Sequence, residues 1–149
     1  MSEPVLELRS ISKNFGAIKA LDDVNLTVEP GSLIVLLGPA GAGKTTTLRI
    51  IAGLETPSSG SVFIEGSDHT QHQPNQRDIA MIFDNLALYP NKSGFQNIAS
   101  PLRIARVPKA EVARRVHEIA GMLKIDHILD RTPATFSGGE RQRVALGRA

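Results

Sequence analysis

The chain is 149 residues long, 41% hydrophobic and 21% charged, with a formal net charge of +2. This composition is ordinary for one soluble globular domain and excludes a disordered or low-complexity chain. Cysteine is absent, which excludes disulfides and thiolate metal sites, and so small a charge gives no reason to expect a nucleic-acid partner. No run approaches the ~20 apolar residues that span a bilayer, and the N-terminus lacks the features of a signal peptide, so membrane association would need a partner protein.

The N-terminal part of the sequence predicts a β-rich region that leads into a buried strand. Apolar residues within 5–8 and in near-alternation over 21–28 indicate short strands joined by a turn around 15–16. The run 33–37 is apolar throughout, as expected of a strand buried on both faces of a parallel sheet. A helix over 44–52 should follow it.

Beyond this helix the pattern changes from strands to helices. The predicted elements are, in order, a turn at 57–60, a short strand over 61–65, a surface loop over 67–78, a buried strand over 79–83, an amphipathic helix from about Pro108 to Leu123, and a last helix over 137–149. The amphipathic helix places Val112, Val116, Ile119 and Leu123 on one face, which is typical of simple packing and carries no chemistry.

A glycine-rich loop lies between the 33–37 run and the helix that follows. It has the phosphate-loop pattern of two glycines five residues apart followed by Lys and Thr. Glycines let successive backbone N–H groups turn toward an anion, and the positive end of the following helix adds to the attraction. We therefore predict that the triphosphate of a nucleotide binds the phosphate loop, composed of Gly38, Pro39, Ala40, Gly41, Ala42, Gly43, Lys44, Thr45 and Thr46.

Three side chains of this loop have separate expected roles. Lys44 would bridge the β- and γ-phosphates, Thr45 would offer its hydroxyl to Mg²⁺, and Thr46 would bond a phosphate nearer the sugar. The alternative is an ordinary glycine-rich turn with a solvated lysine. The apolar run before the loop and the helix after it favour nucleotide binding.

A second motif, the signature segment, contains Ser137, Gly138, Gly139 and Glu140 at the expected start of the last helix. Small residues at a helix N-terminus form an anion-binding geometry. Taken alone, the same residues also fit a capping box, in which Ser137 and Glu140 bond each other's backbone N–H groups. The sequence leaves both interpretations open.

Together the two motifs resemble the ATP-binding-cassette (ABC) transporter ATPases, whose signature is usually Leu-Ser-Gly-Gly-Gln. The resemblance covers essentially the whole chain and is strongest to the ATPases of bacterial importers of sugars and related solutes. It implies an α/β phosphate-loop NTPase fold of the ABC type: an antiparallel β region and part of the nucleotide-binding core with its Q-loop over 1–91, and a helical subdomain with the signature helix over 92–149. The C-terminal core strands of the family would be missing.

The resemblance also implies partners and further site residues. Two such ATPases dimerise head to tail, so Ser137 and Gly139 would contact the γ-phosphate bound by Lys44 of the partner subunit. Phe15 would stack on adenine, although an aromatic residue in a strand is more often part of a core. The loop over 84–90 would meet transmembrane permease subunits at the cytoplasmic face of the inner membrane, with a solute-binding protein acting indirectly, and its Tyr89 is equally explained by packing.

Two positions depart from the family pattern. Asp84 stands where the family has the Q-loop glutamine; a carboxylate can ligate Mg²⁺, but it adds negative charge beside the γ-phosphate. Glu140 stands where the signature has glutamine. The family's Walker B aspartate, catalytic glutamate and switch histidine have no counterpart in these residues, so no catalytic residue is assigned beyond Asp84 at the Q-loop position, and this chain alone should hydrolyse ATP slowly or not at all.

Three functions follow as candidates. The first is the ATP-binding subunit of an importer, which couples ATP binding and hydrolysis, with Mg²⁺, to transport of a solute such as a sugar. The second is a non-catalytic nucleotide-binding module in which binding drives dimerisation, and Asp84 and Glu140 favour it slightly. A third, an ABC ATPase acting on nucleic acid or the ribosome, is disfavoured by the importer-like segment 86–90. Uncovered sheet edges would also make such a fragment marginally stable or oligomeric.

Overall fold

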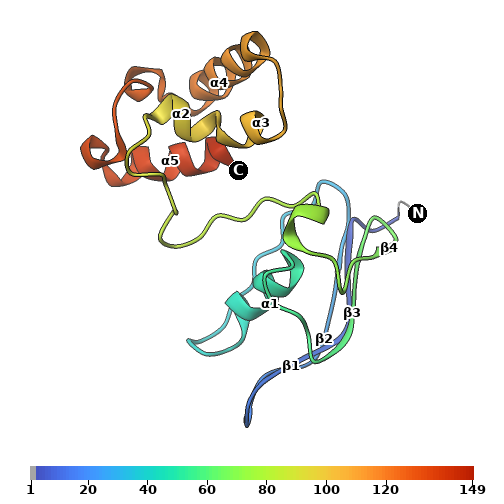
Figure 1. Ribbon diagram of the computed structural model, residues 1–149. Coiled ribbons are helices and arrows are strands. Elements are labelled where there is room, and N and C mark those ends of the chain that lie inside the picture. The colour runs from blue at the N-terminus through green and yellow to red at the C-terminus, as the bar shows by residue number, and fades with distance from the viewer. Residues whose placement is uncertain (1–2) are drawn as a thin grey trace. The chain divides into compact units, whose positions relative to one another are not determined.

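The computed structural model describes residues 3–149, and these form two compact units, one that extends to Ile79 and one over Ala80–Ala149. The first unit contains the sheet and one helix, and the second is helical (Figure 1). The boundary expected at 91–92 stays a prediction about the complete ATPase domain. Within residues 3–149, no helix is both long and apolar enough to cross a lipid bilayer.

The first unit is built on a four-stranded antiparallel sheet with the order β2-β1-β3-β4. Its strands are β1 (Leu6–Phe15), β2 (Ile18–Val28), β3 (Ser59–Ile64) and β4 (Ser67–Asp68). β1 and β2 form the predicted hairpin, and Gly16 in its turn has φ 57°, a conformation that glycine adopts at little cost. The predicted N-terminal strands and the strand near 61–65 are thus confirmed.

Helix α1 (Lys44–Ile51) packs on this sheet and so fixes the position of the loop that precedes it (Figure 1). Ile50 is fully buried with Leu8, Ile11, Leu21 and Val62 in one apolar cluster. Gly53 has φ 73° and its N–H bonds the carbonyl of Ile50, which ends the helix where the sequence predicts.

The two strands predicted from apolar runs are wrong for this chain. Residues 33–37 and 79–83 are irregular, and neither segment pairs with a strand among the described residues. Leu33 and Leu37 are 90% and 88% exposed instead of buried on both faces. A strand needs neighbouring strands to which it can hydrogen-bond. An apolar run indicates that a segment suits a buried position, but it does not show that a partner strand is present.

The surface loop predicted over 67–78 is also more ordered than expected. It contains β4 and a 3₁₀ turn, η1 (Pro74–Gln76). Arg77, near the end of this segment, is buried, so only part of the segment lies at the surface.

The second unit is a cluster of helices. These are α2 (Gly94–Ile98), α3 (Ser100–Ile104), α4 (Lys109–Leu123) and α5 (Gly138–Arg148), with 3₁₀ turns η2 (Asp126–Ile128) and η3 (Pro133–Thr135) before α5. Val112, Val116 and Ala120 are buried on one face of α4, where they meet Ile98 and Val144. The predicted amphipathic helix and final helix are therefore confirmed.

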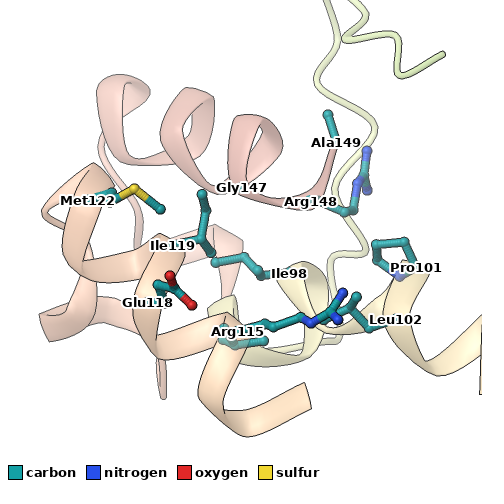
Figure 2. A pocket seen from close by; sticks show the side chains of 11 residues that line it. Ile98, Pro101, Leu102, Arg115, Glu118, Ile119, Met122, Gly147, Arg148 and Ala149 are labelled. Atoms are coloured by element: carbon teal, nitrogen blue, oxygen red, sulfur yellow. The ribbon is translucent and has the colours of Figure 1, made fainter. Parts of the chain in front are cut away.

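An apolar hollow of about 350 Å³ lies within this helical unit (Figure 2). Side chains of α2, α3, α4 and the end of α5 line it, among them Ile98, Leu102, Ile119 and Met122. Arg115, Glu118 and Arg148 also line it, and we assign it no chemistry.

Candidate functional site

The phosphate loop wraps around the N-terminus of α1. Gly38, Gly41 and Gly43 have φ values of 155°, 82° and 81°, and the N–H of Ala42 bonds the carbonyl of Pro39 across the loop. The latter two glycines lie in the left-handed region, where other residues are strained by ~1–2 kcal/mol. The loop therefore has the tight, glycine-dependent backbone that the sequence predicts for an anion cradle.

Gly43 is held at the helix start by the sheet as well as by its own backbone. It is the N-cap of α1, and a Cβ built on it would lie 2.4 Å from Leu21 Cδ2 and 2.7 Å from the Ala20 carbonyl oxygen. Gly41 has a similar φ, but a Cβ there would meet nothing within 4 Å. The loop is thus held against β2 at Gly43, where α1 begins, and has free space around Gly41.

A hollow of about 410 Å³ opens at this loop, lined by Ala20 and residues 40–46. Lys44 Nζ donates to the carbonyl oxygens of Gly38 at 2.7 Å and Pro39 at 2.6 Å, which leaves one of its three N–H donors for an anion. Thr45 is exposed and Thr46 is half-buried, and both line the hollow. The arrangement fits a phosphate chain with Thr45 beside it as a ligand that would hold Mg²⁺.

Phe15 lies at the end of β1 beside the hairpin turn and is 47% exposed, so it is not part of the core. Lys13 Nζ lies 5.0 Å from the centre of its ring. This cation is itself held, since it pairs with Glu55 at 2.7 Å. The exposed ring removes the core explanation and leaves a face on which a base could stack.

The signature segment forms the N-terminus of α5, and it is a capping box as the sequence allowed. Ser137 is the N-cap; its Oγ accepts from the Glu140 N–H at 3.3 Å, and the Ser137 N–H donates to Glu140 Oε2 at 2.7 Å. Gly138 and Gly139 are exposed, neither has a positive φ, and a Cβ on either would meet nothing within 4 Å. Neither the backbone nor the packing of this chain requires glycine there, so capping explains Ser137 and Glu140 but not the two glycines.

The carboxylate of Glu140 is ionised and well supplied with donors. The Ser137 backbone N–H, then the Ser137 hydroxyl, and more weakly the His127 side chain and Arg131, hold the pKa of Glu140 below its usual value. The negative charge expected at this position is therefore present, but the carboxylate is hydrogen-bonded to the N-terminus of α5 itself.

The segment 84–90 is held by two side chains that the sequence did not single out. Fully buried Asn97 accepts the Tyr89 N–H at 2.8 Å and donates to the carbonyls of Tyr89, Lys92 and Ser93 at 3.0–3.2 Å. Arg148 donates to the carbonyls of Leu86 at 3.0 Å and Ala87 at 2.5 Å. Tyr89 itself is half exposed with Lys92 Nζ 4.1 Å from its ring centre, so packing and partner contact both remain open for it.

Asp84 is exposed in a turn at the start of this segment and lines a hollow of about 390 Å³ with Leu88, Pro133 and Arg141. Thr45 belongs to the first unit and Asp84 to the second. Within residues 3–149, no three His, Cys, Asp or Glu side chains form a group that could hold a metal. Asp84 as an Mg²⁺ ligand stays a prediction.

Arg77 is a further buried residue that sequence reasoning missed. Its guanidinium donates to the carbonyls of Ile50 and Ile51 at the C-terminal end of α1, at 2.7 and 2.9 Å, and to those of Thr70 and His72. A cation is favoured at a helix C-terminus. Burial lowers the pKa of Arg77, and its carbonyl partners keep the charge satisfied. The only sign of this role in the sequence is an arginine near the end of a polar segment.

Comparison with known proteins gives matches over nearly the whole chain. The ABC transporter family model matches residues 21–149. The chain is 47% identical over 150 residues to a sulfate/thiosulfate import ATP-binding protein of Pseudomonas aeruginosa, 49% over 144 to an sn-glycerol-3-phosphate import ATP-binding protein of Rhizobium etli, and 46% over 144 to an Fe(3+) ions import ATP-binding protein of Escherichia coli. Each match covers 97% of this chain but only 41–45% of the relative.

Solved structures show the same likeness. A dimeric ATP-binding cassette in a post-hydrolysis state bound to ADP and Pi superposes with a TM-score of 0.83 at 28% identity, covering 96% of this chain and 68% of that one. A second cassette of an ABC transporter gives a TM-score of 0.82. The chain therefore belongs to the ABC transporter ATPase family, and it spans less than half the length of the import ATP-binding proteins that it matches.

Proposed function

We propose that this chain binds Mg-ATP at the phosphate loop, residues 38–46, as part of the ATP-binding subunit of an ABC importer. The observation that carries the proposal is the loop itself: left-handed glycines, an N-terminal helix end and the Lys44 ammonium converge on one hollow. Each of these features favours an anion, and their combination is the geometry of a triphosphate cradle. Phe15 on the same unit supplies a base-stacking face, and Thr45 supplies the Mg²⁺ ligand.

The signature segment serves the nucleotide of a second subunit in this proposal. Gly138 and Gly139 are unexplained within the chain, and their open surroundings support the approach of another molecule. A relative of known structure is described as dimeric and bound to ADP and Pi. We therefore propose that two subunits associate head to tail, with Ser137 and Gly139 near the phosphate held by the other subunit's loop.

The segment 84–90 is proposed to contact the permease at the cytoplasmic face of the membrane. Its backbone is fixed by Asn97 and Arg148, as a surface that transmits force would need to be. The names of the three relatives refer to import of sulfate or thiosulfate, sn-glycerol-3-phosphate and Fe(3+) ions, which supports solute import as the function. A sugar is a further candidate solute, although none of these three names refers to one.

We further propose that this chain alone binds nucleotide without turning it over rapidly. None of its histidines, at 69, 72, 117 and 127, stands at the position of the family's switch histidine, and no residue matches the catalytic glutamate. In a purified sample, ATP hydrolysis measured over hours should remain near the rate without protein. Turnover comparable with a transporter ATPase would contradict this.

Calorimetric titration with Mg-ATP tests the leading proposal. Wild-type chain should show saturable binding, and Lys44→Ala should weaken it about 10- to 100-fold, since a charge-assisted hydrogen bond contributes ~1.5–3 kcal/mol. Arg49→Ala, which removes one positive charge from the same helix outside the loop, is the matched control and should bind normally. Equal binding by wild type and Lys44→Ala, with both folded, would overturn the assignment of the loop.

A further inference from the structure

Three charged side chains meet at the N-terminal end of α5, and we call them the signature charge cluster: His127, Arg131 and Glu140. Glu140 Oε1 lies 3.1 Å from His127 Nε2 and 4.0 Å from Arg131 Nη1. Arg131 is held in place because it also donates to the carbonyl oxygen and the hydroxyl of Thr135. The sequence separates His127 from Glu140 by a whole turn and loop, and only the fold brings them together.

Both oxygens of the Glu140 carboxylate have partners. Oε2 accepts the Ser137 N–H, and Oε1 faces His127 and Arg131. The Glu140 side chain is only 20% exposed, whereas that of His127 is 64% exposed. The carboxylate is thus held on its own backbone, and the solvent-facing member of the cluster is the imidazole.

Glu140, in the first turn of α5, has opposite effects on the stability of the helix and on the binding of a phosphate at its N-terminus. It stabilises α5, because negative charge is favourable at a helix N-terminus. It also opposes any phosphate that approaches Ser137 and Gly139, because like charges repel. A cation beside the carboxylate offsets the repulsion while leaving the cap intact.

We propose that His127 and Arg131 are positioning residues for the signature segment: they keep the Glu140 carboxylate on the α5 backbone and so limit its repulsion of a phosphate carried by a second subunit. The inference rests on the proposed function, in which that phosphate belongs to ATP.

Other charged groups stand near the cluster in the chain. Within residues 3–149 none of them makes an ion pair with it: Asp126, Asp130, Arg141 and Arg143. Arg143 instead donates to the carbonyl of Leu123. His127 and Arg131 are therefore the cations that hold the Glu140 carboxylate.

The first test measures ATP-driven association by sedimentation velocity, with occupancy of the phosphate loop followed by a fluorescent ATP analogue. His127→Gln should weaken association about two- to fivefold relative to wild type, the range expected for one exposed charge interaction. His127→Lys keeps a cation beside Glu140 and should associate as tightly as wild type.

Two controls separate the charge effect from general damage. His117→Gln removes an exposed histidine of α4 whose ring centre lies 5.9 Å from that of Phe95, and it should associate as wild type does. Glu140→Gln keeps the capping box but removes the acid, so adding His127→Gln to it should have a smaller effect than in wild type. Additive effects, or equal association by His127→Gln and His117→Gln, would overturn the proposal.

A second measurement does not depend on association. In a carboxyl NMR titration, His127→Gln should raise the pKa of Glu140 toward its usual value, because His127 is one of the groups that keep it low. An unmoved pKa would overturn the pairing itself. Nucleotide binding without any association would count against the proposed head-to-tail function and against the role of His127 and Arg131, whereas loss of nucleotide binding would show failure at the phosphate loop.

Discussion

The side chain of Asn97 bonds both backbone groups of Tyr89: Oδ1 accepts the Tyr89 N–H at 2.8 Å, and Nδ2 donates to the Tyr89 carbonyl at 3.2 Å. Asn97 is fully buried on α2, so these bonds tie the 84–90 segment to the core of the helical unit. The relationship is visible only in the fold, because nothing in the sequence distinguishes Asn97 from a surface asparagine.

Replacing Asn97 should destabilise the helical unit and loosen the proposed permease-contacting segment. Asn97→Ala leaves the Tyr89 N–H and three carbonyls without this partner, and an unsatisfied buried group costs ~1–3 kcal/mol, so we expect a loss of about 2–4 kcal/mol. Urea unfolding gives the free energy. Asn91→Ala, in the same loop but exposed, is the control; equal effects of the two changes would contradict the role of Asn97.

Gly43 and Gly41 share a left-handed φ but differ in their surroundings, so they form a matched pair. Gly41→Ala should cost about 1–2 kcal/mol of stability from backbone strain alone. Gly43→Ala adds a clash with Leu21 and Ala20 and should cost about 3 kcal/mol or more. Thermal unfolding measures the difference, and a Gly43→Ala protein no less stable than Gly41→Ala would show that the loop is not fixed against β2.

Gly139 should matter for association and not for folding. Gly139→Ala places a methyl group in open space on a helix, so stability should be unchanged or higher by up to about 1 kcal/mol. ATP-driven association should nevertheless weaken, because the methyl group occupies space that the second subunit needs. Gly121→Ala, in the last turn of α4, is the control for a helical glycine. Normal association by folded Gly139→Ala would remove the support for head-to-tail contact.

Phe15 should contribute to affinity for the base. Phe15→Ala is expected to weaken Mg-ATP binding about 5- to 50-fold, since stacking of a base on an aromatic ring contributes ~1–3 kcal/mol, and Phe15→Tyr should bind normally. Its cross-strand neighbour Ile18, which is more exposed, provides the control variant Ile18→Ala. If calorimetry gives one affinity for Phe15→Ala and Ile18→Ala, the stacking role is wrong.

The carboxyl group of Glu111 should titrate at an unusually low pH. Hydrogen bonds from Arg114 and then Arg115 lower the pKa of Glu111 to about 2. Because the folded-state pKa is lowered, the stabilisation of α4 is complete above the usual glutamate pKa of 4.5 and is lost as the pH falls toward about 2. NMR titration of the carboxyl carbon measures it: Arg114→Ala should raise the pKa of Glu111 and Arg103→Ala should not.

The predictions from sequence succeeded where a local rule determines the structure. The phosphate loop, the end of α1 at Gly53, the amphipathic face of α4 and the capping box at Ser137 and Glu140 depend on residues within a few positions of one another. Glycine conformations, helical spacing and capping are properties of such short segments. The sequence by itself therefore determined the family, the glycine-dependent conformation of the phosphate loop and the three longest helices, α1, α4 and α5.

The tertiary structure decided what depends on residues far apart in the chain. Segments 33–37 and 79–83 have strand-like composition but no strand partner among the described residues, so they remain irregular. The bonds from Arg77 to α1, from Asn97 to Tyr89 and between His127 and Glu140 likewise join separate segments. Hydrogen bonds and sheet ladders need a partner in space, and composition alone specifies a preference for burial or pairing without saying which distant residue satisfies it.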